Sequence, residues 1–445
     1  MNARELALSV VRDVFPCHPQ SRGMHSAERG AQASFDYRAR RTQLDERDRA
    51  FAAELSYGAI KMRRTLDWYL EPFLSSQRDL PPVVREVLRL AIYELAYTRA
   101  DEHATVFEFV NLAKRHAHRG LANLVNAVLR NFLRQRPPPP RLERFDDEEE
   151  YLATRYSLPT WLVRQWRTLF GSSAETIFAA VNDPPRAAVA INTLKATPDE
   201  AARRLAALGV ETRGSAIVPE ALLLERGGGV PPGDEGEWWP QSESSAMAVD
   251  VLGPQPGEAI LDVCSGRGNK ALQIGARLAG QGTLLCVERD ERKVSTLRRR
   301  MEGAGVAAGV VIGDATAESL LGDQRFDRIL VDAPCSGIGL VGRHPETRWK
   351  KAATDGERLS LTQRALLERM ARNVYPGGAL VYAVCSTDPR ETTEVIDDFL
   401  ARENFERGLI PGAYERLLTD AGDVLVPPGV EGRDGFYIAR IERRP

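Results

Sequence analysis

The second half of the sequence alternates short apolar runs with amphipathic stretches, and this alternation constrains the fold more than any other feature. Six runs have the length and composition of strands: 259–263, 282–288, 308–312, 327–332, 379–384 and 434–441. Four stretches between them have helical spacing: 270–279, 291–304, 357–374 and 391–402. This order predicts a doubly wound, mostly parallel α/β sheet, in which ligands bind beyond the carboxyl ends of the strands.

The front of the sequence has no strand-like alternation and predicts a bundle of helices. Apolar residues recur every three or four positions in 80–98 and again in 121–135. The first fifteen residues predict an amphipathic helix rather than a signal peptide. The proline-rich stretch 136–141 ends the last helix and predicts a stiff spacer.

The middle of the sequence is mixed. Residues 187–196 alternate like a strand, and 197–210 predict a helix with Thr197 as its N-cap. The stretch 225–237 is rich in glycine and proline and marks a boundary. We therefore predict an all-α domain, a linker with a small α+β segment, and an α/β catalytic domain, at 1–137, 138–237 and 238–445.

Composition excludes several classes of protein. No apolar run reaches the ~18 residues that would span a membrane. The five cysteines include no CxxC pair, so neither a disulfide framework nor a metal site is indicated. We expect a cytoplasmic monomer without a metal ion.

The net charge of −2 hides an asymmetry along the chain. Residues 1–145 contain 24 Lys and Arg against 17 Asp and Glu, whereas the remainder contains 36 against 45. A basic front half is compatible with binding of a polyanion such as RNA. Arginine-rich helix faces exposed to solvent would produce the same asymmetry, so charge alone does not decide.

A glycine-containing turn follows the first predicted strand of the sheet. The chain runs from the strand through Gly266 and Gly268 into a helix, whose first N–H groups are free to bind a ligand. Glu288 ends the next strand, where a carboxylate can accept both hydroxyls of a ribose. This pattern fits NAD(P) nearly as well as S-adenosylmethionine.

Two further features favour S-adenosylmethionine, the residue at position 271 and Asp262. Ala271 occupies the position of the third glycine in a dinucleotide-binding motif. Asp262 precedes the loop, where it can meet a cationic amino-acid tail. Asp314 follows the third strand, at a height that suits an adenine amino group.

Two of the cysteines occupy positions that packing does not explain. Cys335 and Cys385 both follow the ends of predicted strands, on the side of the sheet where a ligand should lie. Cys286, by contrast, lies within an apolar strand, and Cys264 and Cys17 are explained by loop packing and by a position near the N-terminus.

Methylation of a pyrimidine at C5 would use two thiols. Cytosine C5 is too weak a nucleophile to attack a sulfonium methyl group directly, but a thiolate that adds to C6 converts the ring into an enamine. A second group must then help to remove the C5 proton and expel the thiol. An acid at the position of Asp332 could hydrogen-bond the cytosine edge and stabilise the adduct.

These motifs carry a resemblance to a known family. "DAPCSGIGLVGRHPETRWKK" (332–351) and "LVYAVCSTDPRET" (380–392) resemble the two cysteine motifs of the bacterial 16S rRNA cytosine-C5 methyltransferases of the RsmB (Sun/Fmu) type, within the NOL1/NOP2/Sun family. The stretches 240–264 and 431–441 are similar to the entry and the closing strand of that fold. The helical front, with 45–61, resembles the NusB-like RNA-binding domain fused in this type.

The resemblance implies roles for individual residues. Cys385 would attack C6, Cys335 would promote release of the methylated base, and Asp332 would bind the cytosine edge in a pocket that Lys270 also lines. S-adenosyl-L-methionine would be the cofactor and RNA, specifically 16S rRNA, the partner. The implied cofactor-binding residues are Cys264, Ser265, Gly266, Arg267, Gly268, Asn269, Lys270, Glu288, Asp314 and Asp332.

The sequence departs from the family in the glycine loop, and it leaves alternatives open. The family loop reads C-A-A-P-G-G-K, whereas Arg267 and Asn269 here replace the proline and a glycine. One alternative is the same chemistry on transfer RNA or on another rRNA cytosine. A second is a non-catalytic RNA-binding assembly factor, and a third is an NAD(P) oxidoreductase, which would leave both cysteine motifs unexplained.

Overall fold

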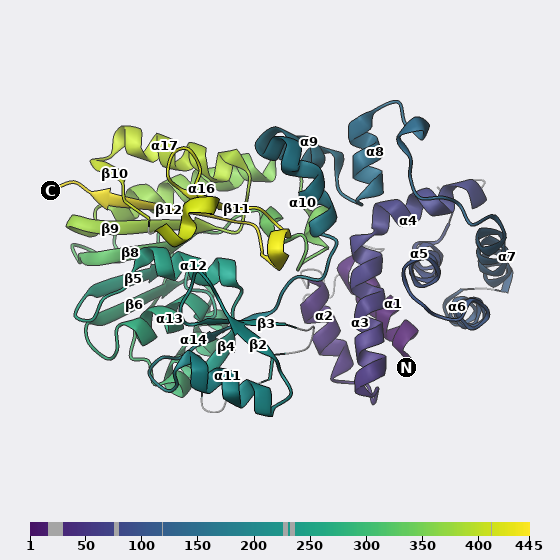
Figure 1. Ribbon diagram of the computed structural model, residues 1–445, viewed down its shortest axis with the longest axis horizontal. Coiled ribbons are helices and arrows are strands. Elements are labelled where there is room, and N and C mark those ends of the chain that lie inside the picture. Colours follow the sequence, from purple (N-terminus) through teal and green to yellow (C-terminus); the bar gives the residue numbers. More distant parts are fainter. Residues whose placement is uncertain (17–29, 75–79, 118, 226–229, 232–235, 411) are drawn as a thin grey trace. The chain divides into compact units, whose positions relative to one another are not determined.

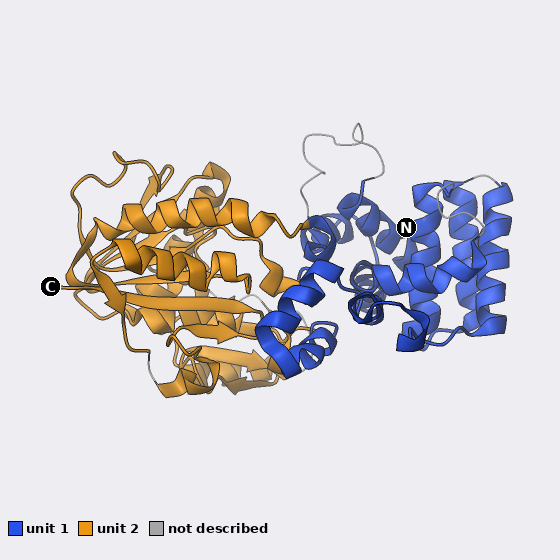
Figure 2. Cartoon of the chain, turned by 90° about the horizontal axis from the view of Figure 1, so that it is seen from above, with its two compact units in different colours: residues 1–182, 344–350 blue, residues 183–343, 351–445 orange. Residues whose placement is uncertain are grey.

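The computed structural model describes residues 1–16, 30–74, 80–117, 119–225, 230–231, 236–410 and 412–445 (Figure 1). These residues form two compact units: residues 1–182 with 344–350, and residues 183–343 with 351–445 (Figure 2). Cys17 and most of the predicted turn-rich stretch before residue 236 lie outside the described residues. Within the described part of the chain, no helix combines the length and apolar character needed to cross a membrane.

The first unit is built from helices, as the front of the sequence predicts. They are α1 (Ala3–Val14), α2 (Ala31–Ala39), α3 (Glu46–Lys61), α4 (Arg63–Leu70), α5 (Pro82–Tyr97), α6 (Glu102–His116), α7 (Arg119–Gln135), α8 (Glu148–Arg155), α9 (Thr160–Phe170) and α10 (Ala174–Ala180). Helices α5 and α7 confirm the two predicted amphipathic stretches, because their apolar stripes, with those of α1, α3, α4 and α6, form one buried core.

A short piece of distant sequence completes the first unit. Residues 344–350, which include α15 (Thr347–Lys350), belong to this unit although both flanking segments belong to the other. The Arg348 side chain is 1% exposed and donates hydrogen bonds to the main-chain oxygens of Ser157 (3.1 Å) and Val181 (2.8 Å) and to Oδ1 of Asn182 (2.7 Å). Burial lowers the pKa of Arg348 to about 9. The chain thus crosses between the units within the first cysteine motif, after residue 343.

The second unit begins with a small antiparallel sheet in the order β2-β3-β1-β4. Its strands are β1 (Ala188–Ile191), β2 (Thr212–Gly214), β3 (Ala221–Leu224) and β4 (Trp238–Pro240). The connecting helix α11 (Pro198–Ala207) starts with a capping box between Thr197 and Glu200, which confirms Thr197 as the N-cap. Strand β4 lies beyond residue 237, and the domain boundaries themselves stay predictions.

The main sheet of the second unit has the order β10-β12-β9-β8-β5-β6-β7, with β11 paired to β12 (Figure 1). Its strands are β5 (Ala259–Val263), β6 (Thr283–Glu288), β7 (Gly309–Ile312), β8 (Phe326–Asp332), β9 (Val374–Val384), β10 (Phe405–Arg407), β11 (Val424–Val426) and β12 (Phe436–Arg443). The five strands β5–β9 run parallel, and β12 pairs antiparallel with β9 and β10. The predicted doubly wound, mostly parallel sheet is confirmed.

Strand β9 starts five residues earlier than the sequence predicts. Its register against β8 shifts between the pairs Phe326–Val374 and Arg328–Ala379, so β9 contains extra residues there. Those residues include Pro376 and Gly377, and Gly377 adopts a φ of +77°. Proline and glycine are typical of turns, which is why the sequence pattern alone hides this end of the strand.

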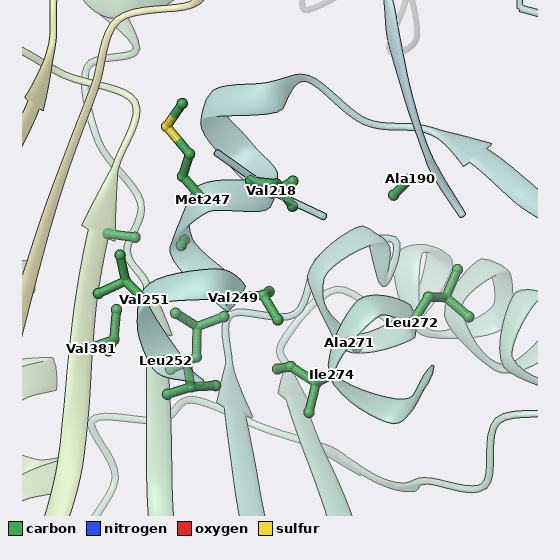
Figure 3. Packing of buried hydrophobic residues seen from close by; sticks show 14 of the residues in the cluster. Ala190, Val218, Met247, Val249, Val251, Leu252, Ala271, Leu272, Ile274 and Val381 are labelled. Atoms are coloured by element: carbon green, nitrogen blue, oxygen red, sulfur yellow. The ribbon is translucent and has the colours of Figure 1, made fainter. Parts of the chain in front are cut away.

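Helices cover both faces of the main sheet. Helices α12 (Glu243–Leu252), α13 (Asn269–Arg277) and α14 (Glu291–Ala304) contribute to one buried core, and Figure 3 shows α12 and α13 residues of that core with Val381 of β9. Helices α16 (Asp355–Ala371) and α17 (Thr393–Arg402) contribute to a second core with the other side chains of β8 and β9. Because β5, β6, β8 and β9 run parallel, their carboxyl ends lie at one edge of this covered sheet.

Candidate active site

The loop between β5 and α13 has an unusual backbone conformation. Cys264, Gly266 and Gly268 have φ values of +63°, +60° and +88°. A Cβ atom on Gly268 would lie 2.4 Å from Cδ1 of Leu297, whereas one on Gly266 would contact only the main-chain oxygen of Cys264, at 3.9 Å. The positive φ values favour glycine at both positions. With glycine at these positions, the main chain of the loop can come close to a bound ligand.

One cavity of about 630 Å³ opens beside this loop, a size that suits a small-molecule ligand. Five residues predicted to bind the cofactor line it: Cys264, Gly266, Glu288, Asp314 and Asp332. We call this the first cavity. Sequence reasoning missed its wall on α16, where Leu361 is 67% exposed and offers an apolar surface to a flat ring. An exposed leucine on an amphipathic helix gives no signal in the sequence.

Two carboxylates of the first cavity are held by hydrogen bonds. Glu288 is buried and accepts from the main-chain N–H groups of Gly266 and Asp290, both at 2.9 Å. Oδ1 of Asp314 accepts from the N–H (2.9 Å) and hydroxyl (2.7 Å) of Thr316, and these bonds lower the pKa of Asp314. Both groups are thus oriented acceptors, as binding of a ribose and an adenine amino group requires.

Asp262 lies at the floor of the site with an unsatisfied charge. Its side chain is fully buried, and neither carboxylate oxygen has a hydrogen-bond partner among the described residues. The Ser265 hydroxyl donates to the main-chain oxygen of Asp262 instead (2.8 Å). Burial raises the pKa of Asp262 to about 7. A buried carboxylate without a partner fits a cationic ligand group, such as the ammonium of an amino-acid tail.

A second cavity, of about 960 Å³, lies on the other side of the loop. It shares Gly266, Lys293 and Asp332 with the first cavity, and Asp262 lines it too. The predicted residues Ser265, Arg267, Asn269 and Lys270 complete this lining. Nζ of Lys270 lies 2.7 Å from Oδ2 of Asp332. Gly268 lines neither cavity. The structure therefore divides the predicted loop residues between two spaces.

The two predicted catalytic cysteines lie in contact. Sγ of Cys335, in the loop after β8, is 3.3 Å from Sγ of Cys385, which follows β9. Both cysteines are free thiols and half-buried. The hydrogen bond to Cys385 and burial raise the pKa of Cys335 well above its ordinary value. Cys335 therefore stays protonated at neutral pH.

The remaining two described cysteines differ from this pair. Cys286 is fully buried in β6, and burial raises the pKa of its thiol. Cys264 lines the first cavity through its loop position, and burial raises the pKa of its thiol to about 12. Neither thiol is poised to ionise. Cys286 packs in the core, whereas Cys264 both packs against a core and lines the first cavity.

Glu391 connects the two cysteine loops, and sequence reasoning missed it. Its carboxylate is fully buried and accepts hydrogen bonds from the Ser336 N–H (2.8 Å), the Ser336 hydroxyl, the Ser386 hydroxyl (2.6 Å) and Nε2 of Gln363 (3.1 Å). Ser336 follows Cys335, and Ser386 follows Cys385. The carboxylate thus fixes both thiols relative to each other. The only sequence signal was an acidic residue at the end of the second motif.

Replacement of Glu391 by alanine should uncouple the cysteine loops. Each buried donor left without an acceptor costs about 1–3 kcal/mol, and a small displacement of the thiols should lower kcat about 100-fold. Glu391→Gln keeps one oxygen acceptor and should restore most of kcat. Cofactor affinity should change little, because Glu391 lines neither cavity. Steady-state kinetics and calorimetric binding of S-adenosylhomocysteine check this, and equal kcat for both variants would contradict it.

Family models match three stretches of the chain. The model described as 16S rRNA methyltransferase RsmB/F matches residues 249–442, the NusB family model matches residues 1–134, and the ferredoxin-like domain of RsmF/B-like methyltransferases matches residues 158–231. The chain is 31% identical to "Probable ribosomal RNA small subunit methyltransferase B" of Bacillus subtilis over 90% of this chain and 92% of that protein. The chain belongs to the RsmB/F family of 16S rRNA methyltransferases.

Further relatives and solved structures agree with this assignment. A Synechocystis protein with the same printed name is 30% identical over the full length of both chains. The solved structure named PH0851 has a TM-score of 0.82, with 23% identity over 99% of both chains. A methyltransferase homologue from Pyrococcus horikoshii has a TM-score of 0.59 over 67% of this chain and all of that one. These two structures show that the fold is shared.

Family membership decides between the alternatives for the glycine loop. The RsmB/F chain is a methyltransferase, and S-adenosyl-L-methionine is its cofactor, so the NAD(P) oxidoreductase alternative is wrong. The buried carboxylate of Asp262 and the oriented acceptors Glu288 and Asp314 fit that cofactor. The predicted NusB-like domain at the front is confirmed as well.

Proposed function

We propose that this protein methylates cytosine at C5 in 16S rRNA through a covalent bond between Cys385 and C6 of the base. The observation that carries the proposal is the contact between Cys385 and Cys335, at 3.3 Å, beyond the carboxyl ends of two neighbouring strands. A single thiol would suffice for packing. Two thiols in contact at the ligand edge of the sheet match the two tasks of C5 methylation, which are attack at C6 and release of the product.

The cofactor would be held by residues of both cavities. Glu288 and Asp314 of the first cavity would accept the ribose hydroxyls and the adenine amino group, and Asp262, which lines the second cavity, would accept the ammonium of the methionine tail. When bound, S-adenosylmethionine supplies an electrophilic methyl group for C5. Gly266 has no side chain and lines both cavities, so the main chain can approach this ligand closely.

The protein's own groups would carry the rest of the chemistry. Cys385, as thiolate, would add to C6, while Asp332 would hold the N3 and amine edge of cytosine. The ion pair with Lys270, at 2.7 Å, holds the Asp332 carboxylate in place. After transfer, C5 would lose its proton as the bond between Cys385 and C6 breaks. Cys335 would give its thiol proton to the departing sulfur of Cys385, 3.3 Å away, and take up the proton from C5.

The test is transfer of labelled methyl from S-adenosylmethionine to unmodified, protein-free 16S rRNA, with mapping of the product by mass spectrometry. A single 5-methylcytidine in 16S rRNA is expected. If only transfer RNA or another rRNA cytosine is methylated, the proposed substrate is wrong but the proposed chemistry stands. Cofactor binding without transfer to any RNA, naked or in ribosomal particles, would contradict the proposal and favour the non-catalytic assembly factor.

Cofactor affinity should depend on pH through Asp262. Its raised pKa of about 7 means that the carboxylate gains a proton as the pH falls through 7, and the neutral acid no longer attracts an ammonium group. From pH 7 to pH 6 the ionised fraction falls from about one half to one tenth, so affinity should fall about fivefold. Calorimetric titration with S-adenosylhomocysteine measures this. Asp262→Asn should bind weakly with no such slope, and an unchanged slope in that variant would contradict the assignment.

A further inference from the structure

The second cavity contains two arginines that the chemistry above does not use. Arg300 lies on α14, and its Nη1 donates hydrogen bonds to the main-chain oxygen of Arg267 (2.8 Å) and to Oδ1 of Asn269 (2.6 Å). Nδ2 of Asn269 in turn donates to the main-chain oxygen of Pro240 (3.0 Å). These bonds fix the Arg300 guanidinium against the loop without any ligand.

Most of the hydrogen-bonding capacity of the two guanidinium groups is unused. Both bonds of Arg300 leave from Nη1, so its Nε and Nη2 groups have no partner within the described part of the chain. The Arg267 side chain is exposed and makes neither a hydrogen bond nor an ion pair with another described residue. A guanidinium carries five N–H donors in a planar fork. The cavity therefore offers several donors to a ligand with several acceptor oxygens.

The positive charge of these two residues is also uncompensated. The other two cations of the cavity have carboxylate partners, Lys270 with Asp332 at 2.7 Å and Lys293 with Glu288 at 3.9 Å. Arg267 and Arg300 have no carboxylate at ion-pair distance among the described residues. Burial, and then the positive charge of Arg267, lower the pKa of Arg300, so the two groups lie close enough to repel each other. An anion bound between them would remove this repulsion.

We propose that Arg267 and Arg300 bind a backbone phosphate of the substrate RNA in the second cavity. The proposal rests on the RNA methyltransferase function proposed above. Guanidinium forks match phosphate oxygens in a bidentate manner. Asp332 lines the same cavity, so a nucleotide whose base reaches Asp332 brings its phosphates into this space. S-adenosylmethionine has no phosphate, and the methionine carboxylate is the competing anion.

The test measures RNA binding and cofactor binding separately on the full chain. The variants are Arg267→Gln, Arg300→Gln and, as a matched control on the same helix, Arg299→Gln, which is exposed and lines neither cavity. For Arg267→Gln and for Arg300→Gln, the Kd for unmodified 16S rRNA should rise about 5–10-fold at 0.1 M salt. The slope of log Kd against log salt should decrease by about 0.7 for each lost phosphate contact. The Kd for S-adenosylhomocysteine should change less than twofold in Arg267→Gln.

Four other outcomes would contradict the proposal. If Arg267→Gln and Arg300→Gln bind RNA as tightly as Arg299→Gln does, the proposed phosphate contact is wrong. It is also wrong if the unsubstituted protein does not bind RNA. Weaker S-adenosylhomocysteine binding with unchanged RNA affinity assigns the cavity to the cofactor carboxylate. Arg267-dependent binding of inorganic phosphate that does not compete with RNA assigns it to a free anion. RNA binding is measured without catalysis. If the unsubstituted protein binds RNA but does not transfer methyl, that result contradicts the proposed function and not the phosphate contact.

Discussion

Cys385→Ala should abolish methyl transfer to RNA, with a loss of rate of at least about 10⁴-fold. Without a thiolate to add to C6, cytosine C5 stays too weak a nucleophile for the methyl group. Cofactor binding should persist, because Cys385 lines neither cavity. Transfer of labelled methyl to unmodified 16S rRNA and calorimetric titration with S-adenosylhomocysteine give the two readouts.

Cys286→Ala is the matched control for this loss. Cys286 is also a thiol of the main sheet, but it is fully buried in β6 and distant in sequence from both cysteine motifs. Its loss should lower thermal stability through poorer packing and leave the rate of transfer close to normal. If Cys385→Ala transfers methyl as fast as Cys286→Ala, the covalent route through Cys385 is wrong.

Cys335→Ala should trap the protein on its RNA. If Cys335 promotes release of the methylated base, its removal leaves the addition of Cys385 to C6 intact and prevents cleavage of that bond after methyl transfer. About one methyl group per protein should then be transferred, and a covalent protein–RNA complex should accumulate that survives denaturing electrophoresis. Turnover after this first cycle should be about 100-fold or more slower than in the unsubstituted protein.

The double variant Cys335→Ala/Cys385→Ala separates this trap from non-specific crosslinking. The complex should disappear in the double variant, because Cys385 supplies the bond to C6. The complex should also be absent when S-adenosylmethionine is omitted from the reaction. Normal turnover by Cys335→Ala, or a complex that survives in the double variant, would contradict the roles assigned to the two thiols.

Much of the fold could be predicted because its signals are local. Six of the eight strands of the main sheet and helices α13, α14, α16 and α17 follow apolar patterns that a short window of sequence contains. The three-residue strands β10 and β11 are too short to give such a pattern and were not predicted. The N-cap at Thr197 needs only three neighbouring residues. Strand β9 was mispredicted at its start, because Pro376 and Gly377 form a bulge that only pairing with β8 stabilises.

The candidate site was predicted in part, because parallel strands align their carboxyl ends. That rule brings Glu288, Asp314 and Asp332 to one edge, and the structure places all three around the first cavity. The rule does not say how a loop divides the space above that edge. Arg267 and Asn269 belong to the same seven-residue loop as Cys264, yet they line the second cavity. Their partner Arg300 lies 31 residues beyond Asn269.

The sequence by itself determined which elements form, which face of each is apolar, and which chemical groups follow the strand ends. Those properties depend on the spacing of neighbouring residues. Only the tertiary structure decided the contact between Cys335 and Cys385, the bridge through Glu391, and the burial of Arg348 in the helical unit. Each of these joins residues far apart in the chain, and their distances are set by how strands pair and helices pack, which no local pattern records.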